Sequence, residues 1–320
     1  MRKLSYAAPL ILAVTSLSVS MADAATPGSQ REMPESSPLG RALVAYVNGN
    51  FAEAIRLFRP LAEKGDASAQ YALGTMYHEG NGVPRNFAEA LRWSRLAAEQ
   101  GDGGAQYNLG FMYGHGEGVA QNYAEAVRWY RLAVQQGNAD AQDGLGVAYR
   151  DGQGVTRDYA EALRLFRLAA AQGNASSQYN LGVMHDQGQG VEQDYIEAAR
   201  WYRLAAQQGI ADAQYNLGVI YRNGFGVAQN YPEAVRWYRL AAQQGVADAQ
   251  MNLGVMYAMG RGVSPDKVKA FAWFALAAAQ GSSLAKENRD QLLRLMTAAQ
   301  VTAGRAHAAM CQQSNYKRCE

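Results

Sequence analysis

Histidine and cysteine, which often catalyse reactions or bind metals, are few in this 320-residue chain, with four His and two Cys. An enzyme site needs unlike groups that converge, such as a nucleophile beside a base, and the sequence offers no such set. The histidines fall at different positions of the repeated pattern described below, so they cannot form one cluster with metal-ligand spacing. They are His78, His115, His185 and His307. We therefore predict no catalytic residue, no metal site and no cofactor.

Side chains suited to binding do recur at fixed spacing. An asparagine amide that projects from a helix can pair with both the donor and the acceptor of an extended peptide, and a neighbouring tyrosine offers rigid apolar area with a polar tip. We hypothesise that such residues line a peptide-binding groove. The alternative is that the asparagines bond to the neighbouring repeat and set its stacking. The candidate residues are Tyr107, Asn108, Tyr179, Asn180, Tyr215, Asn216 and Asn252, with Met251 in a tyrosine position.

Two departures from the repeated pattern point to partner specificity. In the third repeat, Asp143 and Gly144 replace Tyr and Asn, and Ala148 replaces the usual Met, so we expect an acidic and less bulky surface there. One helical turn after the asparagines, the residue type changes from repeat to repeat. We expect this variable position to set partner selectivity more than stability, chiefly through Arg150, Asp186 and Arg222; its other members are His78, Gly114 and Ala258.

Arginine pairs form a second recurring set. Their members lie three residues apart, as in Arg92 and Arg95, which places both on one side of a helix. One interpretation is a stripe that grips an anionic polymer. The other is a solvated surface in which the first arginine pairs with a glutamate such as Glu89. The remaining pairs are Arg128/Arg131, Arg164/Arg167, Arg200/Arg203 and Arg236/Arg239.

These residues are positioned by a repeat of 36 residues, which is visible as an Ala-Gln or Ser-Gln pair, a Leu-Gly pair and a Gly-x-Gly-Val turn in every unit. Apolar spacing predicts a first helix over about 67–78. The second helix should begin at an Asn or Asp whose side chain accepts first-turn amide hydrogens. Glu three residues later, as from Asn122 to Glu125, has capping-box spacing. A Gln-Gly pair such as Gln100-Gly101 should end the helix, since glycine adopts the left-handed conformation.

A glycine inside the first helix, such as Gly110, costs about 1 kcal/mol relative to alanine. We expect it to permit close approach of the second helix, where tryptophans recur at one phase and should pack in the core. One helix pair cannot bury its apolar face, whereas stacked pairs share a continuous core, so an all-α solenoid is predicted. The tryptophans are Trp93, Trp129, Trp201, Trp237 and Trp273, with Leu165 in the third unit.

The combined pattern resembles the Sel-one-like repeat family, which is related to the tetratricopeptide repeats. Its elements are Ala-x-Ala-Gln-Tyr-Asn-Leu-Gly, Gly-x-Gly-Val, and Asn/Asp-Tyr-x-Glu-Ala-x-x-Trp-Tyr. The resemblance implies a right-handed superhelix of antiparallel helix pairs with the first helices on the concave side. It also implies an adaptor role in a bacterial envelope. Cysteine-rich relatives linked to β-lactam binding carry a disulfide in each repeat, and this chain does not, so that activity transfers poorly.

The pattern divides the chain into five parts. Six repeats occupy 67–102, 103–138, 139–174, 175–210, 211–246 and 247–282. A degenerate helix pair over 39–66 precedes them, and a helical cap over 283–320 follows. Residues 25–38, rich in Pro and Ser, are expected to form a flexible leader. Residues 1–24 have the basic start, the apolar run and the Ala-x-Ala ending of a signal peptide that is cleaved near Ala24.

Composition excludes some partners. A net charge of +2 argues against nucleic-acid binding, which normally involves a marked basic excess. The N-terminal apolar run is too short to span a bilayer, so we expect no stable membrane insertion after cleavage and a periplasmic or secreted location. Cys311 and Cys319 can pair in an oxidising compartment; two free thiols are the alternative.

The function predicted from the sequence is a non-enzymatic scaffold that holds a protein or an extended peptide. Two alternatives remain at this point. One is a β-lactam-binding or hydrolytic enzyme, and the other is a protein that binds anionic polysaccharide through the arginine pairs.

Overall fold

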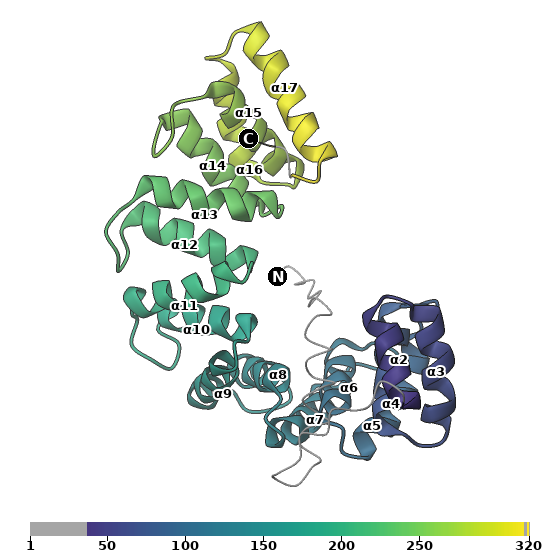
Figure 1. Ribbon diagram of the computed structural model, residues 1–320. Helices are drawn as coiled ribbons and strands as arrows, with labels where there is room; N and C mark the ends of the chain where they lie inside the picture. The colour runs from purple at the N-terminus through teal and green to yellow at the C-terminus, as the bar shows by residue number, and fades with distance from the viewer. Residues whose placement is uncertain (1–36, 317–318, 320) are drawn as a thin grey trace. The chain divides into compact units, whose positions relative to one another are not determined.

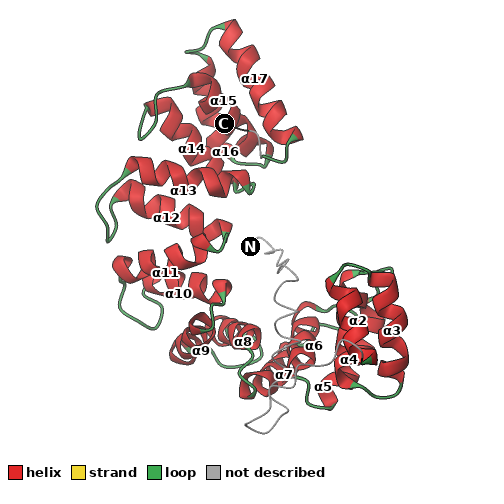
Figure 2. Ribbon diagram, in the orientation of Figure 1, coloured by secondary structure: helices red, strands yellow, loops and turns green. Residues whose placement is uncertain are grey.

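The computed structural model describes residues 37–316 and residue 319, and every regular element in those residues is an α-helix (Figure 2). The signal peptide and most of the leader lie outside the described residues; Ser37 and Pro38 already belong to the fold, because the Ser37 side chain caps the first described helix. None of the helices in the described part of the chain is long and apolar enough to cross a membrane.

The helices form antiparallel pairs in chain order (Figure 1). The observed helix ends lie within a few residues of those predicted from the sequence, as for the first helix predicted over about 67–78. The first helices of the six repeats are α4 (Ala67–Glu79), α6 (Gly103–His115), α8 (Ala139–Asp151), α10 (Ala175–Gln187), α12 (Ala211–Asn223) and α14 (Ala247–Met259). The second helices are α5 (Phe87–Glu99), α7 (Tyr123–Gln135), α9 (Tyr159–Ala171), α11 (Tyr195–Gln207), α13 (Tyr231–Gln243) and α15 (Lys267–Ala279). The terminal pairs are α2 (Pro38–Val47) with α3 (Phe51–Glu63), and α16 (Ser283–Leu293) with α17 (Ala298–Gln313).

The chain divides into two compact units, residues 1–172 and 173–320. In the described residues, the first unit contains α2 to α9 and the second contains α10 to α17. Within each unit the helix pairs stack, and the fold is that of an all-α repeat solenoid.

The helix ends follow the predicted chemistry with one correction. All six Asn or Asp caps accept a first-turn amide hydrogen, as Asn122 Oδ1 does from the Glu125 amide at 3.1 Å. The predicted capping box is wrong, because the Asn122 backbone amide already donates to the Tyr113 carbonyl at 2.8 Å. Glu125 therefore pairs with Arg128 instead, Nε to Oε2 at 3.1 Å.

The glycine inside five of the six first helices receives an aromatic ring, but the ring is not that of the tryptophan; the sixth, Gly74, faces Ser94. A Cβ added at Gly110 would lie 2.5 Å from the ring of Tyr130, the residue after Trp129. Tyr202, Tyr238, Phe166 and Phe274 occupy the same place in other repeats. The tryptophans pack in the core as predicted, except that Trp201 is only half-buried.

Within the units, buried glutamines connect helix pairs to their neighbours. Gln106 donates from Nε2 to the Ala98 carbonyl at the end of α5, at 3.3 Å. Its Oε1 accepts a hydrogen bond from Gln136 Nε2 at 2.8 Å, and Gln136 also donates to the Gly101 carbonyl at 2.9 Å. In the sequence these glutamines mark the start of each repeat, but their spacing does not reveal the hydrogen bonds. They are Gln70, Gln106, Gln142, Gln178, Gln214 and Gln250, and all are buried.

The close approach at Gly110 generates a stability prediction. Gly110→Ala should lower the free energy of unfolding by about 1–3 kcal/mol, because the new methyl group meets the Tyr130 ring. The matched control is Gly114→Ala in the same helix, where the nearest atom would be 3.7 Å away. That variant should gain up to about 1 kcal/mol from helix propensity. Denaturant unfolding of both variants checks this, and equal midpoints would contradict it.

Candidate functional site

Three rows of residues on the first helices form one surface in each unit, which we call the first-helix surface. The rows lie at positions i, i+4 and i+7 of each helix, so they share one side. The middle row, which sequence reasoning missed, is apolar except at Thr75, and all of its members are half-buried. In the first unit the i row contains Tyr71, Tyr107 and Asp143, and the middle row contains Thr75, Phe111 and Val147. The i+7 row, which we call the variable row, contains His78, Gly114 and Arg150. In the second unit the i row contains Tyr179, Tyr215 and Met251, the middle row contains Val183, Val219 and Val255, and the variable row contains Asp186, Arg222 and Ala258.

The tyrosines of this surface lie against rings of the second helices. The ring centroids of Tyr107 and Tyr130 are 6.0 Å apart, and those of Tyr215 and Tyr238 are 6.1 Å apart. Burial raises the pKa of Tyr107 well above its ordinary value, and the neighbouring Asp140 adds to the effect. Burial likewise raises the pKa of Tyr215. Both phenols are therefore neutral near pH 7 and offer an apolar ring with a polar tip.

Three of the four asparagines in the candidate groove bond to the preceding repeat. Asn108 Nδ2 donates to Thr75 Oγ1 at 3.3 Å, and Asn252 Oδ1 accepts from Arg222 Nη1 at 2.9 Å. Asn216 bonds to Tyr202 of the preceding helix pair. Asn180 is buried, with 3% of its surface exposed. These contacts are the ones expected of side chains that set the stacking, the alternative left open by the sequence.

The variable row combines half-buried charge with contacts to the fold. Arg150 pairs with Asp151, Nε to Oδ1 at 2.7 Å. Asp186 accepts a hydrogen bond from Tyr202 Oη at 3.3 Å. Burial raises the pKa of Asp186, while that hydrogen bond acts in the opposite direction. The three charges are thus half-buried and held in place, which suits them to recognise complementary charges on a partner.

In the third repeat Asp143 is half-buried at the tyrosine position, whereas Ala148 is buried in the core and, contrary to expectation, does not belong to the surface. A Cβ added at Gly144 would lie 2.9 Å from the Tyr130 ring, so this ring occupies space that a longer side chain would need. Burial raises the pKa of Tyr130, and the negative charge of Asp143 contributes. At the places where other repeats have a tyrosine and an asparagine, the third repeat therefore has the Asp143 carboxylate and Gly144. The carboxylate lies near Tyr107 and Tyr130.

The first two repeats are joined by a histidine at the variable position. His78 Nε2 lies 2.7 Å from Glu117 Oε2, and the His78 ring meets the edges of Phe87 and Phe111. The adjacent Glu79 accepts a hydrogen bond from Asn81 Nδ2 at 2.6 Å. Burial raises the pKa of Glu79 to about 7.

The histidines do not converge in the described residues. His115 stacks on Phe111, His307 Nε2 bonds to the Cys319 carbonyl at 3.0 Å, and His185 takes the tyrosine place before the Asp194 cap. No group of three or more His, Cys, Asp or Glu side chains in the described part of the chain could hold a metal ion.

The arginines of the second helices are held by neighbouring side chains. The first of each pair bonds to the glutamate three residues earlier, as Arg92 Nη1 does to Glu89 Oε2 at 3.3 Å. Four of these five arginines also stack over the adjacent tryptophan, the exception being Arg164 beside Leu165. The second donates to a tyrosine of the next repeat, as Arg95 Nη2 does to Tyr113 Oη at 2.7 Å. The latter bond recurs in the pairs Arg131–Tyr149, Arg203–Tyr221 and Arg239–Tyr257. The arrangement is typical of a solvated, internally paired surface.

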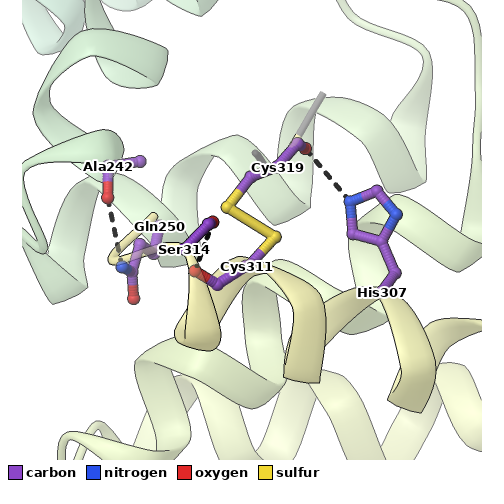
Figure 3. Close-up of a disulfide and its surroundings, with 6 residues drawn as sticks. All are labelled: Ala242, Gln250, His307, Cys311, Ser314 and Cys319. Carbon is purple, nitrogen blue, oxygen red and sulfur yellow. Dashed lines mark hydrogen bonds between the residues drawn. A yellow bond between two sulfur atoms is a disulfide. The ribbon is translucent and has the colours of Figure 1, made fainter. Parts of the chain in front are cut away.

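The C-terminal cap contains a disulfide between Cys311 and Cys319 (Figure 3). Both cysteines are fully buried and pack in the same apolar cluster as α13 to α15. Tyr316 also contacts the repeats, since its ring lies next to Gly245 at the turn between α13 and α14. The disulfide therefore joins Cys319 to α17, and both cysteines pack against the last repeats.

Comparison with known proteins places these features in a family. The sequence model of the Sel1 repeat matches seven segments, 43–66, 67–102, 104–138, 139–174, 175–210, 211–246 and 247–282. The first of these is the pair that the sequence analysis treated as degenerate. No curated protein matches the chain.

Solved structures similar to this chain include one with the same fold. A Sel1 repeat protein from Oxalobacter formigenes is 34% identical, with a TM-score of 0.70 over 76% of this chain and 99% of its own. The protective antigen c5321 of uropathogenic Escherichia coli is 29% identical, with a TM-score of 0.39. The match covers 89% of this chain and 79% of the antigen chain. The immunity protein Pa5087 of Pseudomonas aeruginosa is 21% identical over 68% of this chain and 83% of its own, with a TM-score of 0.44.

The raised pKa of Glu79 generates a pH prediction. Because the folded-state pKa of about 7 lies above the ordinary value of 4.5, this carboxyl favours folding while it is protonated. Its contribution is complete below about pH 4.5 and is lost as the pH rises to about 7. Glu79→Gln, which stays neutral, should therefore become progressively more stable than the native protein over this range.

Denaturation midpoints of both proteins at several pH values between 4.5 and 8 measure the difference. Glu63→Gln, at an exposed position of α3, is the control and should show a flat difference. A flat difference for Glu79→Gln as well would disprove the assignment.

Proposed function

The chain belongs to the Sel1 repeat family, and on this premise we propose that it is an exported scaffold that binds an extended segment of a partner protein on the first-helix surface. Sel1 repeat proteins are generally non-enzymatic scaffolds for protein interactions. The repeats supply the framework for such a role, and the exported location rests on the sequence of residues 1–24 alone.

The observation that carries the proposal is the composition of the first-helix surface. Its middle row presents half-buried apolar side chains such as Val219, flanked by the Tyr215 ring on one side and by Arg222 on the other. Apolar area bounded by polar groups is the usual anatomy of a protein interface. Because the surrounding groups change little between repeats, the variable row is the natural place for selectivity, and its charges can favour one partner over another.

The asparagines have a supporting part in this proposal. Asn252 holds the Arg222 guanidinium through a hydrogen bond of 2.9 Å, so it orients a charged side chain at the surface rather than contacting the partner. The binding residues we propose are therefore the tyrosines, the middle row and the variable row.

Site-specific photo-crosslinking in cells tests the location of the interface. The photoreactive residue replaces Val219 on α12, and in a second variant Leu240 on α13, a partly exposed apolar residue of the same repeat on the second helix. Val219 should yield a discrete adduct with a partner protein that mass spectrometry identifies, and Leu240 should not, because α13 carries no row of the first-helix surface.

Either of two results would count against the proposal. An adduct formed only from Leu240 would place the interface on the second helices. The absence of an adduct from both positions, with the protein present in normal amounts, would remove the case for a stable partner.

A further inference from the structure

The outer side of α15 differs from that of every other second helix of the repeats. At the places where the others carry the arginine pair, α15 has Ala272 and Ala275. Helix α17 packs against α15 here, and a Cβ added at Gly304 of α17 would lie 2.6 Å from the Phe271 ring. The arginines are therefore absent where a helix must approach closely.

Helix α17 does not cover this side completely. A groove of about 490 Å³ remains between α16 and α17, with α15 contributing the third wall. Its apolar lining includes Phe271, Leu276 and Leu293, and small side chains such as Ala308 keep it open. This volume lies within the range of small-ligand sites in proteins, about 300–1,000 Å³.

Two guanidinium groups border the groove, Arg289 from α16 and Arg305 from α17. Arg289 is bonded to Asp290, Nη2 to Oδ1 at 2.7 Å. Arg305 is exposed and has no hydrogen bond or ion pair with any described residue. The cap over 283–320 is basic in sequence, because it has Lys286, Arg289, Arg294, Arg305, Lys317 and Arg318 against Glu287, Asp290 and Glu320.

We propose that this groove binds the C-terminal carboxylate of a peptide whose last side chain is apolar. The guanidinium of Arg305 offers parallel donors that match a carboxylate, and Arg289 adds positive charge from the opposite helix. The apolar side chain fits against Phe271 and Leu276, and Gln312 at the edge of the groove offers an amide that can pair with a peptide group. The groove shares no residue with the first-helix surface, so it would be a second binding site.

Fluorescence polarisation with the full chain tests this. The probe is an N-terminally fluorescein-labelled peptide of sequence Gly-Ser-Ala-Leu with a free C-terminal carboxylate, and the same peptide with a C-terminal amide is the comparison. The free acid should bind saturably and the amide at least about tenfold more weakly, since loss of a charge-assisted hydrogen bond costs about that factor or more.

Two arginine variants localise the binding. Arg305→Gln should weaken binding of the free acid by about tenfold or more. Arg294→Gln, at an exposed arginine that follows α16 and lies outside the groove, should leave its affinity unchanged. Ala309→Trp, which fills the groove from an exposed wall position, should abolish binding without changing the unfolding midpoint.

The proposal is overturned by equal affinity for acid and amide, by equal losses in the two arginine variants, or by no saturable binding of the free acid. Binding of dodecanoate in the absence of peptide binding would assign the groove to a fatty acid and would overturn it as well.

Discussion

Buried glutamine side chains impose the constraint on which the repeat architecture depends. An amide removed from water without partners costs about 1–3 kcal/mol, so both of its ends must be satisfied. At Gln106 this is achieved only when the end of α5 presents the Ala98 carbonyl and the end of α7 presents Gln136. Gln136 also donates to the Gly101 carbonyl of the preceding repeat. The two glutamines thereby fix the end of α5, the start of α6 and the end of α7 relative to one another.

The remaining contacts follow from that placement. With the start of α6 fixed, Gly110 faces the second helix and admits the Tyr130 ring, while Phe111 is turned to the half-buried surface. The two roles alternate along one helix because adjacent residues are about 100° apart. A first helix that was rotated or shifted would lose both the ring packing and the outward-facing row, so the binding surface depends on contacts that no partner touches.

Much of the fold could be predicted from the sequence because its determinants are local. Asn122 signals a helix start and Gly101 a helix end through their own chemistry, and their recurrence every 36 residues removes ambiguity. The capping box failed because the amide it needed was already bonded to the Tyr113 carbonyl, a partner nine residues away that spacing does not reveal. The direction of the asparagines could not be predicted for a similar reason. Periodicity places Asn108 and Asn252 at one phase, but only the three-dimensional structure shows that Thr75 and Arg222 of the preceding repeat lie within reach.

A double-mutant cycle between Gln106 and Gln136 tests the central claim most directly. The single variants Gln106→Ala and Gln136→Ala and the double variant are compared with the native protein by denaturant unfolding. A cycle that pairs Gln106 with Gln172, which bonds to Gln142 instead, serves as the reference. The account predicts a coupling free energy of about 1 kcal/mol or more for Gln106 with Gln136 and none for Gln106 with Gln172. Additive losses in both cycles would show that the glutamine contacts do not hold the repeats together and would contradict the account.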